Sequence, residues 1–283
     1  MRPVAVVSDR ACDITAEQAR EYAVTIVPLV VRFGEDVIHD DGSLTAESFW
    51  ERVRSSATPP QTSQPSIGAF EAAFEPLVDA GYDVLCPVLS GRLSGTLNSA
   101  HAAAKRFAGH VTVVDTMALS IAQGFQVLAA AEAARAGRTV REIVGELDGI
   151  RRRTRLSIML ETVEFLRRGG RAGALMPFID RITRALRVRP LLTLSSGALS
   201  LAGVARSVAG ARTRILDELA RAAPVETVTV GHTRRPDEAA AFACELSQRL
   251  GMSAAAVPIV EAGPALSSHG GPGILAVAAI TRA

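Results

Sequence analysis

Residues 89–98, with the sequence LSGRLSGTLN, decide the fold of the first half of the chain. The apolar run of residues 84–89 that leads into them is typical of a buried strand, and an alanine-rich helical pattern follows them. Gly91 and Gly95 stand among hydroxyl side chains in this stretch. A strand that turns through Gly and Ser into a helix presents free backbone N–H groups at the helix N-terminus. The stretch therefore predicts an anion-binding turn at the end of a strand.

Strand and helix patterns alternate on both sides of this turn. Strands are expected at residues 4–7, 24–33, 84–89 and 111–114, with a bend or an edge at Pro28. Helices are expected at residues 15–22, 45–54, 67–80, 99–107, 118–136 and 140–152. Residues 34–42 look like a polar turn, and residues 55–65 look irregular. Strands that alternate with helices of this length predict a parallel α/β/α sheet.

The second half has a different pattern. Two expected strands, residues 190–194 and 199–204, flank Ser195-Ser196-Gly197, which is a hairpin signal. Further strands are expected at residues 157–160, 225–230, 254–260 and 274–280, and helices at residues 162–168, 208–222 and 236–250. A helical stripe of apolar residues is formed by Leu175, Phe178, Ile179, Ile182 and Leu186. The chain is therefore predicted to form two domains, an N-terminal parallel α/β domain of residues 1–155 and a C-terminal α/β domain with a mixed sheet of residues 156–283.

The composition is that of a folded globular protein. The 283 residues are 48% hydrophobic and 21% charged, which excludes a disordered chain. The net charge of +2 gives no general argument for a nucleic acid partner. Cys12, Cys86 and Cys244 are far apart and have no metal-like spacing, so we expect buried free thiols in a reducing cytosol. The sequence shows neither a signal peptide nor a membrane segment, and the predicted location is cytoplasmic.

Polar side chains recur where the predicted strands end. Ser8-Asp9, residues 90–96 and Asp115-Thr116 each follow a strand, and the loop of residues 62–66 can reach the same edge. Ligands of open α/β sheets bind at this edge. The turn lacks the lysine of a phosphate loop and the G-x-S-x-G pattern of a hydrolase. Asp9, Asp13 and Asp115 are better explained as capping or solvated carboxylates than as metal ligands, so no metal site is predicted.

A second candidate element lies near the C-terminus. His269 stands in the sequence His-Gly-Gly-Pro-Gly, at the start of the last expected strand. Glycines beside it allow a ligand to approach the backbone closely, so His269 is predicted to lie in an exposed loop and to have a functional role. The basic turn of residues 167–171 fits a helix C-terminus, and Arg206 could point into a cleft.

These stretches, in this order, resemble the DegV family of bacterial fatty-acid-binding proteins over essentially the whole chain. The motif Thr-Ser-Gln-Pro-Ser is residues 62–66, Leu-Ser-Gly-Thr is residues 93–96, and Arg-Gly-Gly-Arg is residues 168–171. Arg-Pro-Leu-Leu is residues 189–192, and His-x-Gly-Pro-Gly is residues 269–273. Each motif is short, but five of them in the same order are specific.

The resemblance implies a two-domain α/β protein that encloses one long-chain fatty acid. The carboxylate is expected in the interdomain cleft and the acyl chain in an apolar tunnel. The resemblance implies that Thr62, Ser63, Ser94, Gly95, Thr96 and His269 bind the carboxylate. It also suggests Arg206 and Arg171 for charge compensation or for contact with a partner. Burial of a chain of about sixteen carbons contributes roughly 11 kcal/mol gross, at about 0.8 kcal/mol per methylene, and the stripe of residues 175–186 is a candidate lining.

The implied activity is to present the fatty acid to a separate ATP-dependent fatty acid kinase subunit, without catalysis by this chain. The fatty acid is then a ligand, and no cofactor is expected. The partners are the fatty acid and the kinase subunit; a transient membrane contact is compatible with this activity, and no nucleic acid is expected. Where the family usually has Ser-Asp-Ser at the end of the first strand, this chain has Ser8-Asp9-Arg10, which changes the charge where a partner would bind.

Two alternatives remain at the level of the sequence. A serine-dependent acyl hydrolase would use Ser94 as nucleophile and His269 as base, with Asp9 or Asp115 to orient the imidazole. A DNA-binding regulator would use the arginine clusters, but the charge is near neutral and a helix-turn-helix signal is missing.

Overall fold

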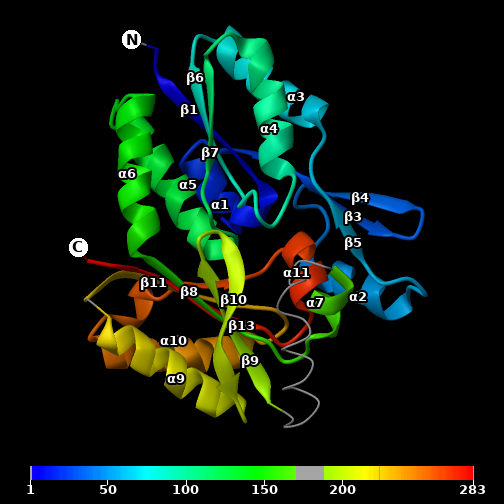
Figure 1. The fold of residues 1–283 in the computed structure, drawn as a ribbon, viewed down its shortest axis with the longest axis vertical. Helices are drawn as coiled ribbons and strands as arrows, with labels where there is room; N and C mark the ends of the chain where they lie inside the picture. Colours follow the sequence, from blue (N-terminus) through cyan, green and yellow to red (C-terminus); the bar gives the residue numbers. More distant parts are fainter. Residues whose placement is uncertain (1, 170–187, 223, 283) are drawn as a thin grey trace. The chain divides into compact units, whose positions relative to one another are not determined.

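The structure is a computed structural model that describes residues 2–169, 188–222 and 224–282. The chain divides into two compact units (Figure 1). The first consists of residues 1–152 together with residues 263–265, and the second of residues 153–262 and 266–283. The sequence predicted a single division after residue 155. It did not predict that residues 263–265, from the second half of the chain, would belong to the first unit.

The first unit is built on a four-stranded parallel sheet in the order β2-β1-β6-β7. Its strands are β1 (Val4–Asp9), β2 (Thr25–Val27), β6 (Asp83–Val88) and β7 (Val111–Asp115). Its helices are α1 (Ala16–Glu21), α2 (Ala46–Ser55), α3 (Ile67–Asp79), α4 (Thr96–Ala104), α5 (Ser120–Arg135) and α6 (Val140–Arg153), with the 3-10 helices η1 (Arg10–Cys12) and η2 (Lys105–Phe107). The predicted parallel α/β sheet is confirmed.

Side-chain alternation along the central strands gives this sheet two apolar faces. Val6 and Leu85 pack with α5 and α6 in one core cluster. Val7 and Val84 belong to the other core cluster, where they pack with Phe70 of α3 and with Ala100 and Ala103 of α4. Figure 1 shows α5 and α6 on one side of the sheet and α3 and α4 on the other. This double covering explains why the central strands read as continuous apolar runs.

A second, antiparallel sheet of three strands extends the first unit, in the order β4-β3-β5 (Figure 1). Its strands are β3 (Leu29–Phe33), β4 (Asp36–Asp40) and β5 (Gln61–Ser63). The expectation of a turn at residues 34–42 was wrong, because only the tip around Gly34 turns and the chain then pairs back on β3. The expected strand 24–33 is divided at Pro28, which fits the bend predicted there.

The second unit contains a six-stranded mixed sheet in the order β10-β9-β8-β13-β11-β12, in which only β11 and β12 pair in parallel. Its strands are β8 (Thr154–Met159), β9 (Arg189–Ser195), β10 (Ala198–Ala205), β11 (Val225–His232), β12 (Ile259–Glu261) and β13 (Leu275–Thr281). Its helices are α7 (Glu164–Gly169), α9 (Val208–Arg221), α10 (Pro236–Leu250) and α11 (Pro264–Gly270), with the 3-10 helix η4 (Ala254–Ala256). Apolar side chains of α9 and α10 pack on this sheet with Val228 and Val277.

Local signals in the sequence located several of these elements. Thr15 and Gln18 form a capping box at the start of α1, and the hydroxyl of Ser66 caps α3. The hairpin at Ser196-Gly197 is confirmed, whereas the strand expected at residues 254–260 is a 3-10 helix followed by the short β12. The expectation of three buried thiols was wrong for Cys244, which is exposed on α10. Within the described residues, every helix is too short or too polar to cross a bilayer.

Residues 263–265 join the first unit through two buried carboxylates. The backbone N–H of Gly263 donates to Asp13 Oδ1 at 3.0 Å, and that of Ala265 donates to Asp40 Oδ2 at 3.1 Å. These two side chains, together with the two backbone amides that donate hydrogen bonds to them, are called the carboxylate clasp. Asp13 Oδ2 also accepts a hydrogen bond from Ser120 Oγ at 2.6 Å.

The clasp makes stability depend on pH. Burial raises the pKa of Asp13 from 3.8 to about 6, against the hydrogen bonds from Ser120 and Gly263, which lower it. The folded state therefore holds this proton more tightly than the unfolded chain does. The contribution of Asp13 to the free energy of unfolding is therefore largest below the unfolded pKa. It is lost as the pH rises through the folded pKa of about 6.

We expect Asp13→Asn to stabilise the first unit at about pH 7.5, by up to roughly 2–3 kcal/mol, because the amide oxygen still accepts from Gly263 and no buried charge remains. Urea unfolding followed by the fluorescence of Trp50, the single tryptophan, measures this. The gain should shrink as the pH falls below 6 and vanish towards about pH 3, below the unfolded pKa of 3.8, where Asp13 is protonated in both states. Asp36→Ala, which removes an exposed carboxylate paired with Arg52, is the control. An equal gain in stability of Asp13→Asn at both pH values would contradict the raised pKa of Asp13.

Candidate functional site

The turn of residues 89–95 lies where β6 ends and α4 begins. Two neighbouring strands supply side chains that fix it. Asp9, at the end of β1, accepts the backbone N–H of Leu89 at 2.7 Å, and Asp115, at the end of β7, accepts that of Gly91 at 3.3 Å. The predicted gathering of polar groups at the carboxyl edge of the sheet is therefore found for these strands.

The hydroxyl groups of Ser94 and Thr96 meet at the start of α4. Their oxygens share a hydrogen bond of 2.8 Å, and the backbone N–H of Thr96 donates to Ser94 Oγ at 3.2 Å. Gly95 is the N-cap residue and provides no side chain to cap the helix. We call these three residues the hydroxyl turn. Its hydroxyls and the positive end of the helix dipole suit a carboxylate or a comparable oxyanion.

The segment of residues 61–66 lies against the hydroxyl turn. A Cβ atom built on Gly95 would lie 2.5 Å from Oε1 and 2.6 Å from Nε2 of Gln64. Glycine at this position thus lets the amide of Gln64 cover the turn. Thr62 is half-buried on β5 opposite Val31 of β3, and Ser63 is exposed beside it. Two motifs that are about thirty residues apart in the sequence are thus brought together at Gln64 and Gly95.

His269 belongs to the second unit, where it lies in the last turn of α11 and is half-buried. The expectation of an exposed loop was wrong, because the helix begins at Pro264 and includes the histidine. Gly169, at the end of α7, faces it: a Cβ on Gly169 would overlap Nδ1 of His269. Gly169 of the first of these motifs is thus in close contact with His269 of the second.

The glycines after His269 make two more close approaches to residues 161–169. A Cβ on Gly271 would lie 2.7 Å from Cδ2 of Phe165, and one on Gly273 would lie 2.8 Å from Cβ of Glu161. Both glycines have positive φ values, 77° and 83°, which disfavour other residues.

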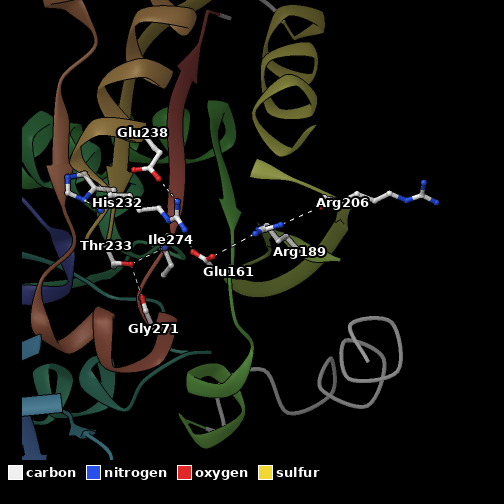
Figure 2. A network of polar contacts seen from close by, with 9 residues as sticks. Glu161, Arg189, Arg206, His232, Thr233, Glu238, Gly271 and Ile274 are labelled. Carbon is white, nitrogen blue, oxygen red and sulfur yellow. Dashed lines mark hydrogen bonds and ion pairs between the residues drawn. The ribbon is translucent and has the colours of Figure 1, made fainter. Parts of the chain in front are cut away.

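Thr233, which the sequence did not single out, fixes the same loop. Its hydroxyl donates to the carbonyl of Gly271 at 2.7 Å and accepts the backbone N–H of Ile274 at 3.0 Å. Figure 2 shows this pair of contacts beside the ion pairs of Glu161. The sequence offers no distinctive signal for this threonine, which follows β11 without a recognisable motif.

Glu161 is the centre of a charged network in the second unit (Figure 2). Its carboxylate pairs with Arg235 and lies 3.7 Å from a guanidinium nitrogen of Arg189. Arg235 also pairs with Glu238. Among the described residues, Arg206 contributes its carbonyl oxygen to the network, and this oxygen accepts a hydrogen bond from Arg189 at 3.4 Å. Its own guanidinium is exposed and points away from the network, and Arg171 lies outside the described residues, as does the stripe of residues 175–186.

The two carboxylates proposed as orienters of a hydrolase histidine are engaged with backbone amides. Asp9 accepts from Ala11 and Leu89, and Asp115 accepts from Met117 and Gly91. They fix the turn that presents Ser94. Within the described residues, no group of three or more acidic, histidine or cysteine side chains could hold a metal ion.

Comparison with known proteins assigns the family. The family model described as "Uncharacterised protein, DegV family" matches residues 3–282. The chain belongs to the DegV family. A DegV domain-containing protein of Listeria innocua is 32% identical over 281 residues, which cover 98% of each chain. One of Streptomyces coelicolor is 33% identical over 286 residues, which cover 99% of each.

Solved structures of the family agree with the fold. A DegV family protein from Thermus thermophilus, described as fatty acid binding, superposes with a TM-score of 0.90 at 32% identity over the full length of both chains. DegV from Bacillus subtilis, described as a fatty acid binding protein, gives a TM-score of 0.87 at 30% identity, again over both full chains. The α/β fold of this DegV protein, with its parallel N-terminal sheet and mixed C-terminal sheet, matches these structures.

We expect Gly169→Ala to displace the imidazole of His269, because the new methyl group and Nδ1 cannot occupy the same space. A histidine side-chain NMR spectrum should show shifted imidazole resonances for His269. Gly145→Ala, on an open position of α6, is the matched control and should only stabilise its helix, by about 0.5–1 kcal/mol. Unchanged His269 resonances in Gly169→Ala would show that the contact is absent.

Proposed function

We propose that this DegV protein binds one long-chain fatty acid, with the carboxylate in the cleft of its two domains and the acyl chain in an apolar tunnel. The observation that carries the proposal is the hydroxyl turn, where two hydroxyl groups and a helix N-terminus offer donors to an oxyanion. Two relatives of at least 30% identity are described as fatty acid binding, which supplies the ligand class.

The carboxylate ligands in this proposal are Ser94, Gly95 and Thr96 of the hydroxyl turn, Thr62 and Ser63 of β5, and His269 of α11. A carboxylate that leaves water needs several hydrogen bonds. Hydroxyl donors and an imidazole provide charge-assisted bonds of this kind. The acyl chain contributes affinity through the burial of its methylene groups, whereas the residues that bind the carboxylate determine its position.

Native mass spectrometry of the purified protein is expected to show a co-purified fatty acid. Ser94→Ala should weaken oleate binding by roughly 10-fold or more, because a hydrogen bond to a charged group contributes about 1.5–3 kcal/mol. Ser66→Ala is the control from the neighbouring motif, since its hydroxyl caps α3. It should lower stability by about 1 kcal/mol and leave affinity unchanged.

Protein that carries no lipid and binds neither oleate nor palmitate would overturn this proposal. Turnover of acyl esters that disappears in Ser94→Ala would instead favour a hydrolase. The engagement of Asp9 and Asp115 with backbone amides disfavours that outcome, because neither carboxylate is then available to orient a catalytic histidine.

The bound fatty acid is proposed to be the substrate of a separate ATP-dependent kinase subunit, with no catalytic residue in this chain. A carboxylate oxygen attacks the γ-phosphorus of ATP, the bond to ADP breaks, and an acyl phosphate forms. The reaction belongs in the cytoplasm, where ATP is available and the buried thiols of Cys12 and Cys86 stay reduced. Arg206, whose guanidinium is exposed, and Arg171 are the candidate contacts for the kinase.

Purified bacterial fatty acid kinase subunits, mixed with ATP and the oleate-loaded protein, should yield acyl phosphate, which hydroxylamine traps as a hydroxamate. Arg206→Ala is expected to reduce turnover severalfold without a change in oleate affinity, because the loss of an exposed charge acts on encounter with the partner. Arg221→Ala, also exposed, is the control. Product at equal rates with free oleate alone would exclude presentation by this chain.

A further inference from the structure

The carboxylate clasp connects residues from the two ends of the chain. Gly263 is 250 positions from Asp13, and Ala265 is 225 from Asp40. A Cβ on Gly263 would lie 3.3 Å from Asp13 Oδ1 and 3.6 Å from Asp40 Oδ2. Both carboxylates therefore surround this one short stretch of backbone.

Each carboxylate is itself held by a side chain of the first unit. Ser120 donates to Asp13, as described above, and Nε of Arg10 lies 3.7 Å from Asp40 Oδ1. Arg10 is the residue that departs from the family pattern. It faces a buried carboxylate, so its charge is compensated within the chain rather than offered to a partner.

The clasp is energetically expensive. Burial raises the pKa of Asp40 as it does that of Asp13, and the two negative charges disfavour each other. Buried charges of this kind are commonly replaced by apolar residues without loss of stability. The hydrogen bonds that they accept are geometrically specific, so their contribution is to fix backbone position.

The backbone that the clasp fixes leads directly to His269. Ala265 is the second residue of α11, and His269 follows four positions later on the same face of the helix. A helical turn is a stiff connection with a rise of about 6 Å over four residues. Beyond the helix, Thr233 fixes Gly271 and Ile274.

We propose that Asp13 and Asp40 are positioning residues for fatty acid binding, which act by placing His269 through the backbone amides of Gly263 and Ala265. The proposal rests on the proposed function, in which His269 binds the carboxylate. Neither aspartate needs to touch the ligand. Their effect on affinity should therefore depend on the presence of the histidine.

A double-mutant cycle tests this dependence. Asp40→Ala is expected to weaken oleate binding by about 5- to 10-fold in the wild-type background and by less than about 2-fold in His269→Ala. Asp40→Asn keeps an acceptor for the Ala265 amide and should restore affinity to within about 2-fold of wild type. Asp41→Ala is the matched control, since this exposed neighbour accepts hydrogen bonds from the backbone and side chain of Ser43 and is not part of the clasp.

Two further measurements separate this proposal from the proposed function. Amide hydrogen exchange at residues 263–265 should accelerate in Asp40→Ala, and the imidazole resonances of His269 should shift, with or without lipid. If Asp40→Ala does not fold, Asp13→Ala is used in the same cycle with the same expected outcomes.

The outcomes are distinguishable. Equal losses of affinity in both backgrounds, or unchanged His269 resonances, would overturn the positioning role. Lack of oleate binding by the wild type, or full affinity in His269→Ala, would overturn the proposed ligand set instead. In that case shifted His269 resonances in Asp40→Ala would still support positioning, and unshifted resonances would refute it.

Discussion

The carboxylate of Asp9 is the interaction on which the first unit depends. It is buried, and it accepts hydrogen bonds from the backbone of Ala11, from the backbone of Leu89 and from the side-chain amide of Gln123. These donors belong to three elements: the start of η1, the turn after β6, and α5. One side chain thus aligns the carboxyl edge of the sheet. Burial raises its pKa, and the three donors oppose that rise because they favour the ionised form.

The position of the hydroxyl turn follows from this alignment. Leu89 is the first residue beyond β6, so the hydrogen bond to Asp9 fixes where the turn begins. Asp115 fixes Gly91 in the same way from β7. The carboxylates of Asp9 and Asp115 accept hydrogen bonds from the backbone N–H groups of Leu89 and Gly91, which therefore cannot donate to a bound anion. The donors left for a ligand are further backbone N–H groups at the start of α4 and the hydroxyl of the Ser94–Thr96 pair that accepts the shared hydrogen bond.

Local patterns explain how much of this the sequence could predict. The apolar run of β6 and the hairpin at Gly197 each depend on neighbours within a few residues, and both were predicted. The strands β4 and β5 were missed because they are short, polar and exposed, and pairing with β3 alone makes them strands. The clasp left no local signal, since its bonds join residues more than two hundred positions apart.

Three glycines of the family motifs, all among the described residues, have a common physical explanation. Each lies where the backbone of one motif meets a side chain from a distant segment: Gly95 meets Gln64, Gly169 meets His269, and Gly271 meets Phe165. A methyl group at any of these positions would displace the partner side chain. The motifs therefore specify pairs of segments that must approach closely, rather than single ligand atoms. For this reason the order of the motifs predicted the family and the fold, whereas the position of His269 within a helix required the structure.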